Sequence, residues 1–174
     1  MKKRTLRTKK RTKLIVGEGI SESLFLARLK QLYYKRGQDY IVTVDQAGGG
    51  DPTSVLRFIL HYAGSFDERY MLIDSDRPIS QECEKKARNN GIKIIQSVPH
   101  CLEGMLLCSL GIKKNVHDTA AAKAAFYPSV CAGETLNESW CERNIDLMMV
   151  DKMLNDSSHS YHEYFSKLVK VMRK

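Results

Sequence analysis

Short apolar runs alternate with longer segments of helical periodicity along the first two thirds of the chain. Four of these runs are almost wholly apolar and predict buried strands, at residues 13–16, 39–45, 70–74 and 92–98. Apolar positions at helical spacing predict helices between and after them, at residues 21–36, from 52 onward, at 79–90 and at 101–110. Strands this apolar, alternating with helices, are typical of a parallel sheet covered on both faces.

The pattern changes beyond about residue 115, where no further run predicts a strand. Three segments there predict helices: DTAAAKAAF, NESWCERNIDLMMVDKML and YHEYFSKLVKVM. We therefore expect an α/β fold in three parts. A basic arm at 1–12 is expected to be disordered on its own, a core with a four-stranded parallel sheet occupies 13–112, and a helical C-terminal extension occupies 113–174.

The net charge of the chain belongs to its N-terminal arm. Residues 1–13 hold eight Lys or Arg and no acid, and the other 20 basic residues balance the 20 acidic ones, which leaves the net charge of +8 in the arm. A block of like charge gains from counterion release beside a phosphate backbone. DNA or RNA is therefore the expected partner, and a solubility tail or a nuclear targeting signal is the alternative.

Other features argue against export, membrane insertion and a zinc centre. No apolar run approaches the roughly 20 residues that cross a bilayer, and no segment has the apolar core of a signal peptide. The missing apolar run also means that no membrane partner is expected. The five cysteines form no CxxC pair, which favours free thiols in a reducing cytoplasm. A zinc set made of Cys131, Cys141, His159 and His162 has unusual spacing, so scattered structural residues are the favoured interpretation.

Acidic residues follow three of the four predicted strands. Glu18 follows the first strand, and Glu22 lies about one helical turn later. Asp74 and Asp76 end the third strand, and Glu103 opens the helix after the fourth. The carboxyl ends of parallel strands share one edge of a sheet, where these acids could not all stay ionised without cations among them. Hard oxygen ligands select Mg²⁺ or Mn²⁺ over zinc. A solvated turn at the Asp pair and a salt bridge at Glu103 are the alternatives.

Four stretches in this order resemble the Toprim domain of topoisomerases, primases and OLD-family nucleases: LIVGEGISESLFL, VTVDQAGGGDPTSVLRFI, MLIDSDRP and SVPHCLEGMLL. The resemblance is closest to the OLD and RloB-like branch and covers about residues 13–110. It implies a Toprim-like, Rossmann-like sheet with helices on both faces and a metal-dependent nuclease with a role in antiphage defence. The glycine-bearing segment at 48–50 matches the family pattern but adds little by itself.

The resemblance also implies roles for the five acids. Asp74 and Asp76 would hold one Mg²⁺ or Mn²⁺ ion together with Glu22, and Glu18 and Glu103 would hold a second, so all five are candidate catalytic and metal-binding residues. In a two-metal scheme, one ion activates a water and the other stabilises the leaving oxygen.

Several supporting residues remain open. Ser75 or Ser97 would add a hydrogen bond, Arg77 would clamp a phosphate oxygen, and His100 would act as a general acid or contact a phosphate. For Arg77 a surface ion pair is the alternative, and for His100 a packed or exposed position. Related nucleases also use a lysine after the last acidic motif, for which the candidates here are Lys113, Lys114 and Lys123.

Two other functions stay open. OLD proteins carry an ATPase, but this chain has no P-loop motif, so a noncatalytic or partner-activated nucleic-acid-binding subunit of an ATPase-containing complex is the alternative. A topoisomerase would need a nucleophilic tyrosine, with candidates at Tyr33, Tyr34, Tyr127 and Tyr161, and a larger DNA gate. The aromatic residues, 8% of the chain, are scattered and predict no stacking platform. The sequence leaves the choice of DNA or RNA, endo- or exonucleolytic action, and a homo-oligomeric state open.

Overall fold

The computed structural model describes residues 9–35, 37–112, 115–130 and 136–173. Four parallel strands form one sheet in the order β2-β1-β3-β4. Their bounds are Arg11–Gly17 for β1, Tyr40–Gln46 for β2, Glu68–Asp74 for β3 and Ile92–Ser97 for β4. The strands are linked by α1 (Ile20–Tyr33), α2 (Pro52–His61) and α3 (Gln81–Asn89). The predicted α/β class with a four-stranded parallel sheet is confirmed.

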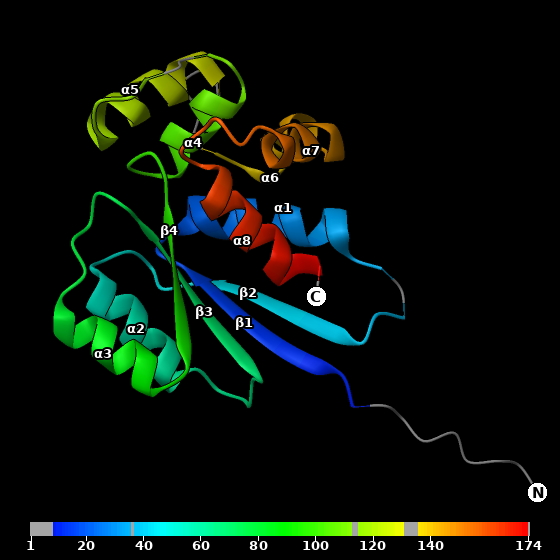
Figure 1. Ribbon diagram of the computed structural model, residues 1–174, viewed down its shortest axis with the longest axis vertical. Coiled ribbons are helices and arrows are strands. Elements are labelled where there is room, and N and C mark those ends of the chain that lie inside the picture. The colour runs from blue at the N-terminus through cyan, green and yellow to red at the C-terminus, as the bar shows by residue number, and fades with distance from the viewer. Residues whose placement is uncertain (1–8, 36, 113–114, 131–135, 174) are drawn as a thin grey trace, which may run out of the picture.

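Helices cover both faces of the sheet, as its apolar strands require (Figure 1). Alternate strand residues point to opposite sides. Ile15 and Leu72 pack into a cluster with α1 and α8 (His162–Arg173), and Leu14 and Met71 pack into a second cluster with α2 and α3. The arrangement matches a Rossmann-like fold.

After β4, the described residues contain helices and connecting loops and no strand. It contains α4 (Leu102–Ser109), α5 (Thr119–Val130), α6 (Glu138–Asn144), α7 (Leu147–Asn155) and α8. The segment 137–154, predicted as one helical stretch, is divided at Ile145 and Asp146. Asp146 has an extended backbone and caps α7, because its Oδ1 accepts a hydrogen bond of 2.8 Å from the Met149 backbone N–H.

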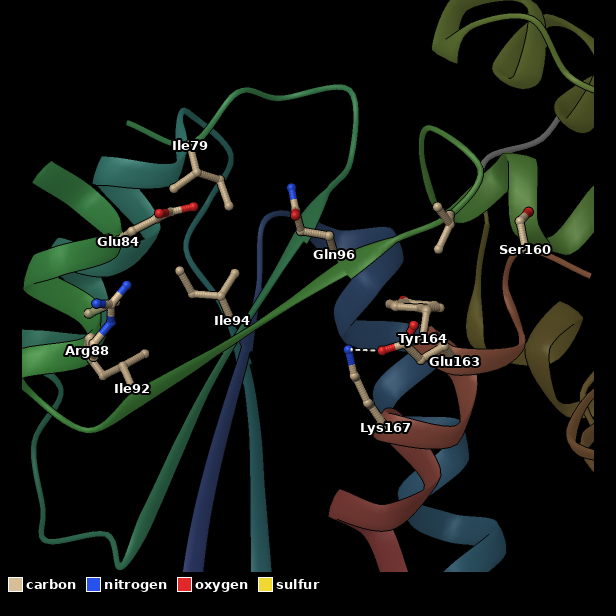
Figure 2. A pocket seen from close by; sticks show the side chains of 12 residues that line it. Ile79, Glu84, Arg88, Ile92, Ile94, Gln96, Ser160, Glu163, Tyr164 and Lys167 are labelled. Atoms are coloured by element: carbon tan, nitrogen blue, oxygen red, sulfur yellow. Dashed lines mark ion pairs between the residues drawn. The ribbon is translucent and has the colours of Figure 1, made fainter. Parts of the chain in front are cut away.

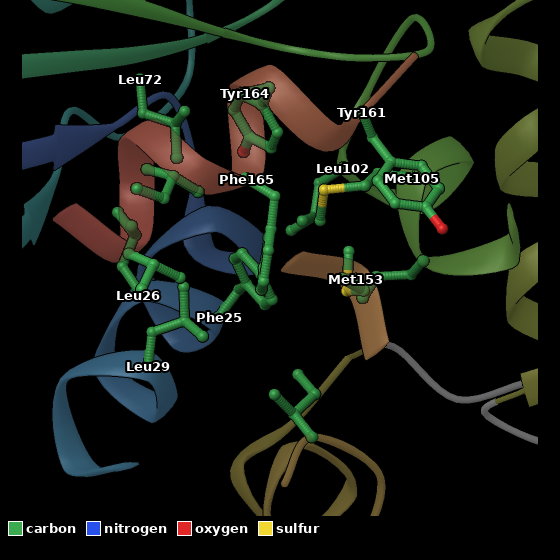
Figure 3. Packing of buried hydrophobic residues seen from close by; sticks show 14 of the residues in the cluster. Phe25, Leu26, Leu29, Leu72, Leu102, Met105, Met153, Tyr161, Tyr164 and Phe165 are labelled. Carbon is green, nitrogen blue, oxygen red and sulfur yellow. The ribbon is translucent and has the colours of Figure 1, made fainter. Parts of the chain in front are cut away.

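One hydrophobic cluster joins the C-terminal helices to the sheet (Figure 3). Phe25 of α1 and Phe165 of α8 lie with their ring centroids 6.3 Å apart, and Met105 of α4 and Met153 of α7 are buried in the same cluster. Helix α8 packs against both α1 and β4. The predicted extension at 113–174 therefore shares its core with the predicted core at 13–112.

The C-terminal end of α8 is attached to the strands by two buried hydrogen bonds. Lys13 Nζ donates to the Val171 carbonyl at 2.9 Å, and Tyr40 Oη donates to the Met172 carbonyl at 2.6 Å. The last carbonyls of a helix lack partners within the helix, and a cation there interacts favourably with its dipole. Burial lowers the pKa of Lys13, and the nearby Glu68 carboxylate opposes that shift.

Strand β1 begins two residues earlier than predicted, so the predicted boundary of the arm at residue 12 is wrong. Arg11 and Thr12 belong to β1, and the Thr12 backbone N–H donates to Asp67 Oδ2 at 2.7 Å. Residues 1–8 of the predicted arm lie outside the described residues.

The basic segment precedes the start of β1 in the sequence, whereas Glu18 follows the end of β1. Seven strand residues separate the two points by about 20 Å, at roughly 3.3 Å per residue.

A groove of about 570 Å³ runs beside the edge strand β4, between α3 and α8 (Figure 2). An ion pair of 2.7 Å between Lys167 and Glu163 lies on its α8 side. The groove contains none of the five acids predicted to bind metal. Within the described part of the chain, no helix is both long and apolar enough to cross a membrane.

We expect the Tyr40 hydroxyl to contribute measurably to stability. Tyr40→Phe keeps the buried ring and leaves the Met172 carbonyl without its partner, so the free energy of unfolding in urea should fall by about 1 kcal/mol. Tyr34→Phe is the matched control, because that side chain is 62% exposed, and it should change stability by less than about 0.5 kcal/mol. Equal effects of the two substitutions would contradict this assignment.

Candidate functional site

The five predicted acids lie around the carboxyl ends of β1, β3 and β4. Glu18 follows β1, and Glu22 is in the first turn of α1. Asp74 is the last residue of β3, Asp76 lies in the turn that follows, and Glu103 is in the first turn of α4. The topology thus brings acids from distant parts of the chain to one edge of the sheet.

Glycine at position 17 lets α1 begin directly over the end of β1. A Cβ atom added to Gly17 would lie 2.6 Å from the Glu22 Cβ, so a larger residue would push Glu22 away from the strand end. Glu22 Oε2 accepts a hydrogen bond of 2.9 Å from the Gly19 backbone N–H, as in a capping box. The local sequence therefore places Glu22 and also uses it to begin the helix.

Gly104 allows a similar close approach at the start of α4. A Cβ atom at this position would lie 2.5 Å from the Pro99 carbonyl oxygen. The first turn of α4, with Glu103, therefore packs tightly against the segment that follows β4.

Three of the acids form a buried inner group. Glu22 is 7% exposed, Asp74 is 7% exposed and Glu103 is 3% exposed. Asp76 is exposed at the surface, and Glu18 lies between the two extremes. Glu22 and Glu103 are in the first turns of their helices, where the helix dipole favours a negative charge. The inner group is where the cost of ionisation is greatest.

Three of the five acids, Glu18, Glu22 and Asp74, have raised pKa values, as expected for crowded carboxyls that are removed from water. Burial raises the pKa of Asp74 to about 7; a hydrogen bond from Ser97 opposes the shift, and the negative charges of Glu22, Glu103 and Glu18 add to it. Burial also raises the pKa of Glu22 and of Glu18. Asp74 is thus poised to change its charge near neutral pH.

Two cations offset part of this negative charge. Arg77 Nη2 lies 3.7 Å from Glu18 Oε1 and is half exposed to solvent. Burial alone would lower the pKa of Lys123, but the carboxylates of Glu103 and Asp74 outweigh that effect and raise it. Of the three lysines considered from the sequence, Lys123 is the one placed beside the acids; Lys113 and Lys114 lie outside the described residues.

One side of α5 covers the acidic edge. Thr119 Oγ1 donates a short hydrogen bond to Asp76, and Tyr127 Oη donates to Glu103 Oε1 at 2.7 Å. Lys123 lies between these two residues, so positions i, i+4 and i+8 of one helix all meet the acids. From the sequence, Tyr127 is a candidate only for a nucleophilic tyrosine, and Thr119 is not a candidate for any role. The spacing of these polar residues within an alanine-rich helix was the available signal.

Buried polar atoms without a partner gather at this edge. Among the described residues, four buried side-chain atoms lack a hydrogen bond: Glu18 Oε2, Glu103 Oε2, Tyr164 Oη and Arg69 Nε. The first two belong to the predicted set of acids. Burial raises the pKa of Tyr164, and the negative charges of Glu22 and Asp74 add to the effect. The Tyr164 hydroxyl is therefore close enough to these two acids to interact with their charges. An unpartnered buried polar group costs about 1–3 kcal/mol, so a polar ligand here would stabilise the fold.

The acids do not form a ready coordination shell. Within the described ranges, no three His, Cys, Asp or Glu side chains are placed so that they could hold a metal ion. Separate protein donors hold individual carboxylates instead: Ser97 Oγ bonds Asp74 Oδ1 at 2.7 Å, Tyr127 bonds Glu103 and Thr119 bonds Asp76. The donor set consists of carboxylate oxygens, which suits Mg²⁺ or Mn²⁺, but binding would require some of these side chains to exchange partners.

Other residues considered from the sequence have structural partners. His100 Nε2 lies 3.0 Å from the Val116 carbonyl, and the His100 carbonyl accepts the Asp76 backbone N–H at 3.1 Å. His100 therefore helps to hold the turn that carries Asp76. Of the two serines predicted to add a hydrogen bond, Ser75 and Ser97, Ser97 donates one to Asp74.

Three residues of the disfavoured zinc set are described by the structure, and they belong to no group that could hold a metal ion. Cys131 lies outside the described residues, and Cys141 is buried in the hydrophobic cluster. His159 is paired with Asp156 at 3.2 Å, and His162 contacts the Leu154 carbonyl. These contacts support the structural interpretation.

No protein-family model, no curated protein and no solved structure matches this chain. The similarity to the Toprim domain therefore rests on the order of the sequence motifs and stays a prediction.

Asp74→Asn should change how stability depends on pH in the absence of divalent cations. The folded-state pKa of Asp74, about 7, is above its ordinary value of 3.8, so its stabilising contribution is complete below 3.8 and is lost as the pH rises through about 7. Asparagine cannot ionise, so the Tm of the variant minus that of the wild type should grow by at least about 3 °C between pH 5 and pH 8.

Asp151→Asn, which changes an exposed acid on α7, is the control and should show no such trend. A difference in Tm that is constant across this pH range for Asp74→Asn would contradict the raised pKa.

Proposed function

We propose that this chain is a Mg²⁺- or Mn²⁺-dependent phosphodiesterase, a small Toprim-type nuclease that resembles the OLD and RloB-like branch and cleaves DNA or RNA. The observation that carries the proposal is the convergence of unpartnered, buried carboxylate oxygens from Glu18 and Glu103 on the buried acids Glu22 and Asp74. By analogy with that branch, the protein acts in antiphage defence in the cytoplasm.

The residues suit this chemistry. When bound, Mg²⁺ or Mn²⁺ supplies an activated water and neutralises the leaving oxygen. Glu22, Asp74 and Glu103 offer the inner oxygen ligands, and Ser97 keeps the Asp74 carboxylate oriented. Glu18 and Asp76 offer the outer ones.

Two basic side chains suit the phosphate of the substrate. Lys123 brings a positive charge to the inner acids, which makes it the candidate for the lysine that follows the last acidic motif. Arg77 is half exposed beside Glu18 and can reach a phosphate oxygen at the mouth of the site.

The second candidate is a partner-activated nucleic-acid-binding subunit of an ATPase-containing complex. It is favoured by the absence, among the described side chains, of three acids grouped to hold an ion. Thr119 and Tyr127 of α5 occupy oxygens of Asp76 and Glu103. In this alternative, a partner protein or a second copy of the chain would move α5 and release them.

Cleavage of labelled DNA and RNA should require Mg²⁺ or Mn²⁺ and should stop in EDTA. Asp74→Ala should lower the cleavage rate at least about 100-fold, since removing a single electrostatic stabiliser at an active site already costs that much. Asp151→Ala is the matched control and should cleave like the wild type. Cleavage that persists in EDTA or in Asp74→Ala would refute the proposed mechanism.

Calorimetric titration with Mn²⁺ distinguishes the phosphodiesterase from the partner-activated subunit, because it measures metal binding independently of cleavage. The phosphodiesterase predicts that the wild type binds Mn²⁺ and that Asp74→Asn binds it at least about tenfold more weakly. Binding of Mn²⁺ without cleavage by the isolated chain would favour the partner-activated subunit. Equal binding by both proteins would contradict the assignment of Asp74 as a ligand.

Deleting residues 2–10 should weaken nucleic-acid binding and reduce its dependence on salt. The deletion removes six basic residues and stops before Arg11, where β1 begins. Each lost contact with a duplex phosphate should reduce the slope of log K against log salt by about 0.9. Lys85→Ala on α3 is the control and should change the slope by no more than one such contact. An unchanged slope in the deletion would exclude the arm from binding.

A further inference from the structure

A groove of about 800 Å³ lies beside the carboxyl end of β2, along the side of α2. Its floor is mainly apolar and includes Ala47, Phe58 and Tyr62, and Arg57 and His61 are exposed at its rim. None of the five acids of the proposed site lines it. The groove therefore differs from the acidic edge in both composition and charge.

Three aromatic rings, spaced four residues apart in the sequence, come together beside the groove. The ring centroids of Phe58 and Tyr62 are 5.6 Å apart, and those of Tyr62 and Phe66 are 5.7 Å apart, both in edge-to-face orientation. Tyr62 Oη donates to Asp45 Oδ2 at 2.8 Å, which fixes the central ring and engages the acid of the groove. The sequence predicts no stacking platform, and this cluster of half-buried rings is the place where the structure offers a candidate for one.

The segment that follows β2 and lines the groove is hydrogen-bonded to the end of β1, where Glu18 lies. The Ala47 backbone N–H donates to the Gly17 carbonyl at 3.0 Å, and the Gly49 N–H donates to the Glu18 carbonyl at 2.8 Å. Gly48 and Gly49 have positive φ, and a Cβ atom on either would meet nothing within 4 Å. The segment between Glu18 and the groove thus carries no side chain at Gly48 and Gly49, and the Gln46 side chain accepts a hydrogen bond from the Gly48 backbone N–H.

We propose that this groove holds an unpaired segment of the nucleic-acid substrate, with a base stacked on Phe58 and a phosphate beside Arg57. The inference rests on the proposed function and names its substrate as nucleic acid with single-stranded character. The rings provide a surface that every base can stack on, and the Arg57 guanidinium at the rim complements the phosphate backbone. Asp45, the acid in the groove, is already bonded to Tyr62 and to the Gln46 backbone N–H.

Fluorescence anisotropy in EDTA tests the proposal without cleavage. The probes are a labelled single-stranded oligonucleotide, an abasic strand of the same length and charge, and a duplex of that length. Phe58→Leu keeps an apolar side chain against the core but removes the ring. It should weaken binding of the intact strand roughly tenfold and leave the abasic strand and the duplex unchanged.

Arg57→Ala should weaken the intact and abasic single strands alike, and Lys85→Ala on α3 should weaken neither. Circular dichroism spectra and Tm values identify any variant that fails to fold, and Phe58→Tyr, which restores a ring, should then recover tight binding of the intact strand. If wild type and Phe58→Leu bind the intact strand equally, or the wild type does not distinguish it from the abasic strand, the groove is not a base-binding site.

Failure of the proposed function gives a different result. In that case the wild type binds the intact strand through Phe58 but cleaves it with neither Mg²⁺ nor Mn²⁺, which supports the groove and contradicts the phosphodiesterase.

Discussion

Repulsion among buried carboxylates is the constraint on which the carboxyl edge of this sheet depends. Glu22, Asp74 and Glu103 are each more than nine-tenths buried, where charges interact strongly and are poorly solvated. The fold tolerates this because α1 and α4 direct their N-termini at the acids and because Lys123 brings a positive charge to them. The compensation is incomplete, since two carboxylate oxygens have no partner. The proposed divalent cation would offset this charge, provided that some of the carboxylates exchange their present partners.

The helices beyond β4 contribute to the hydrophobic core that holds the buried acids in place. The cluster that joins α1, α4, α7 and α8 holds the acid-bearing helices against the sheet (Figure 3). At the far end of the sheet, Lys13 and Tyr40 bond the last carbonyls of α8 and fix its position. Helix α8 then brings Tyr164 toward the acids, and α5 covers them from outside. Contacts across the whole core thus offset the repulsion among the acids at this edge.

Three features that bear on the proposed nucleic-acid substrate lie at different places along the sheet. The basic arm joins the start of β1, the acids surround its end, and the aromatic groove lies beside the end of β2. The start of β1 and the acids at its end are separated by about 20 Å, the length of a seven-residue strand. This separation suits a polymer that contacts several parts of the surface better than a small phosphate ester held at one point. The glycine segment at 48–50 connects the acids to the groove.

The sequence by itself determined the strands, their parallel arrangement and the edge at which Glu18 and Asp74 would meet. These follow from local apolar patterning and from the rule that parallel strands end on one side. Only the tertiary structure decided that Lys123 and Tyr127 of α5 and Tyr164 of α8 also reach this edge. Their helices have no local signal for direction, because the face that a helix presents to a distant strand is set by long-range packing. The edge-to-face contacts among Phe58, Tyr62 and Phe66 are likewise a property of the tertiary structure, although their spacing of four residues is visible in the sequence.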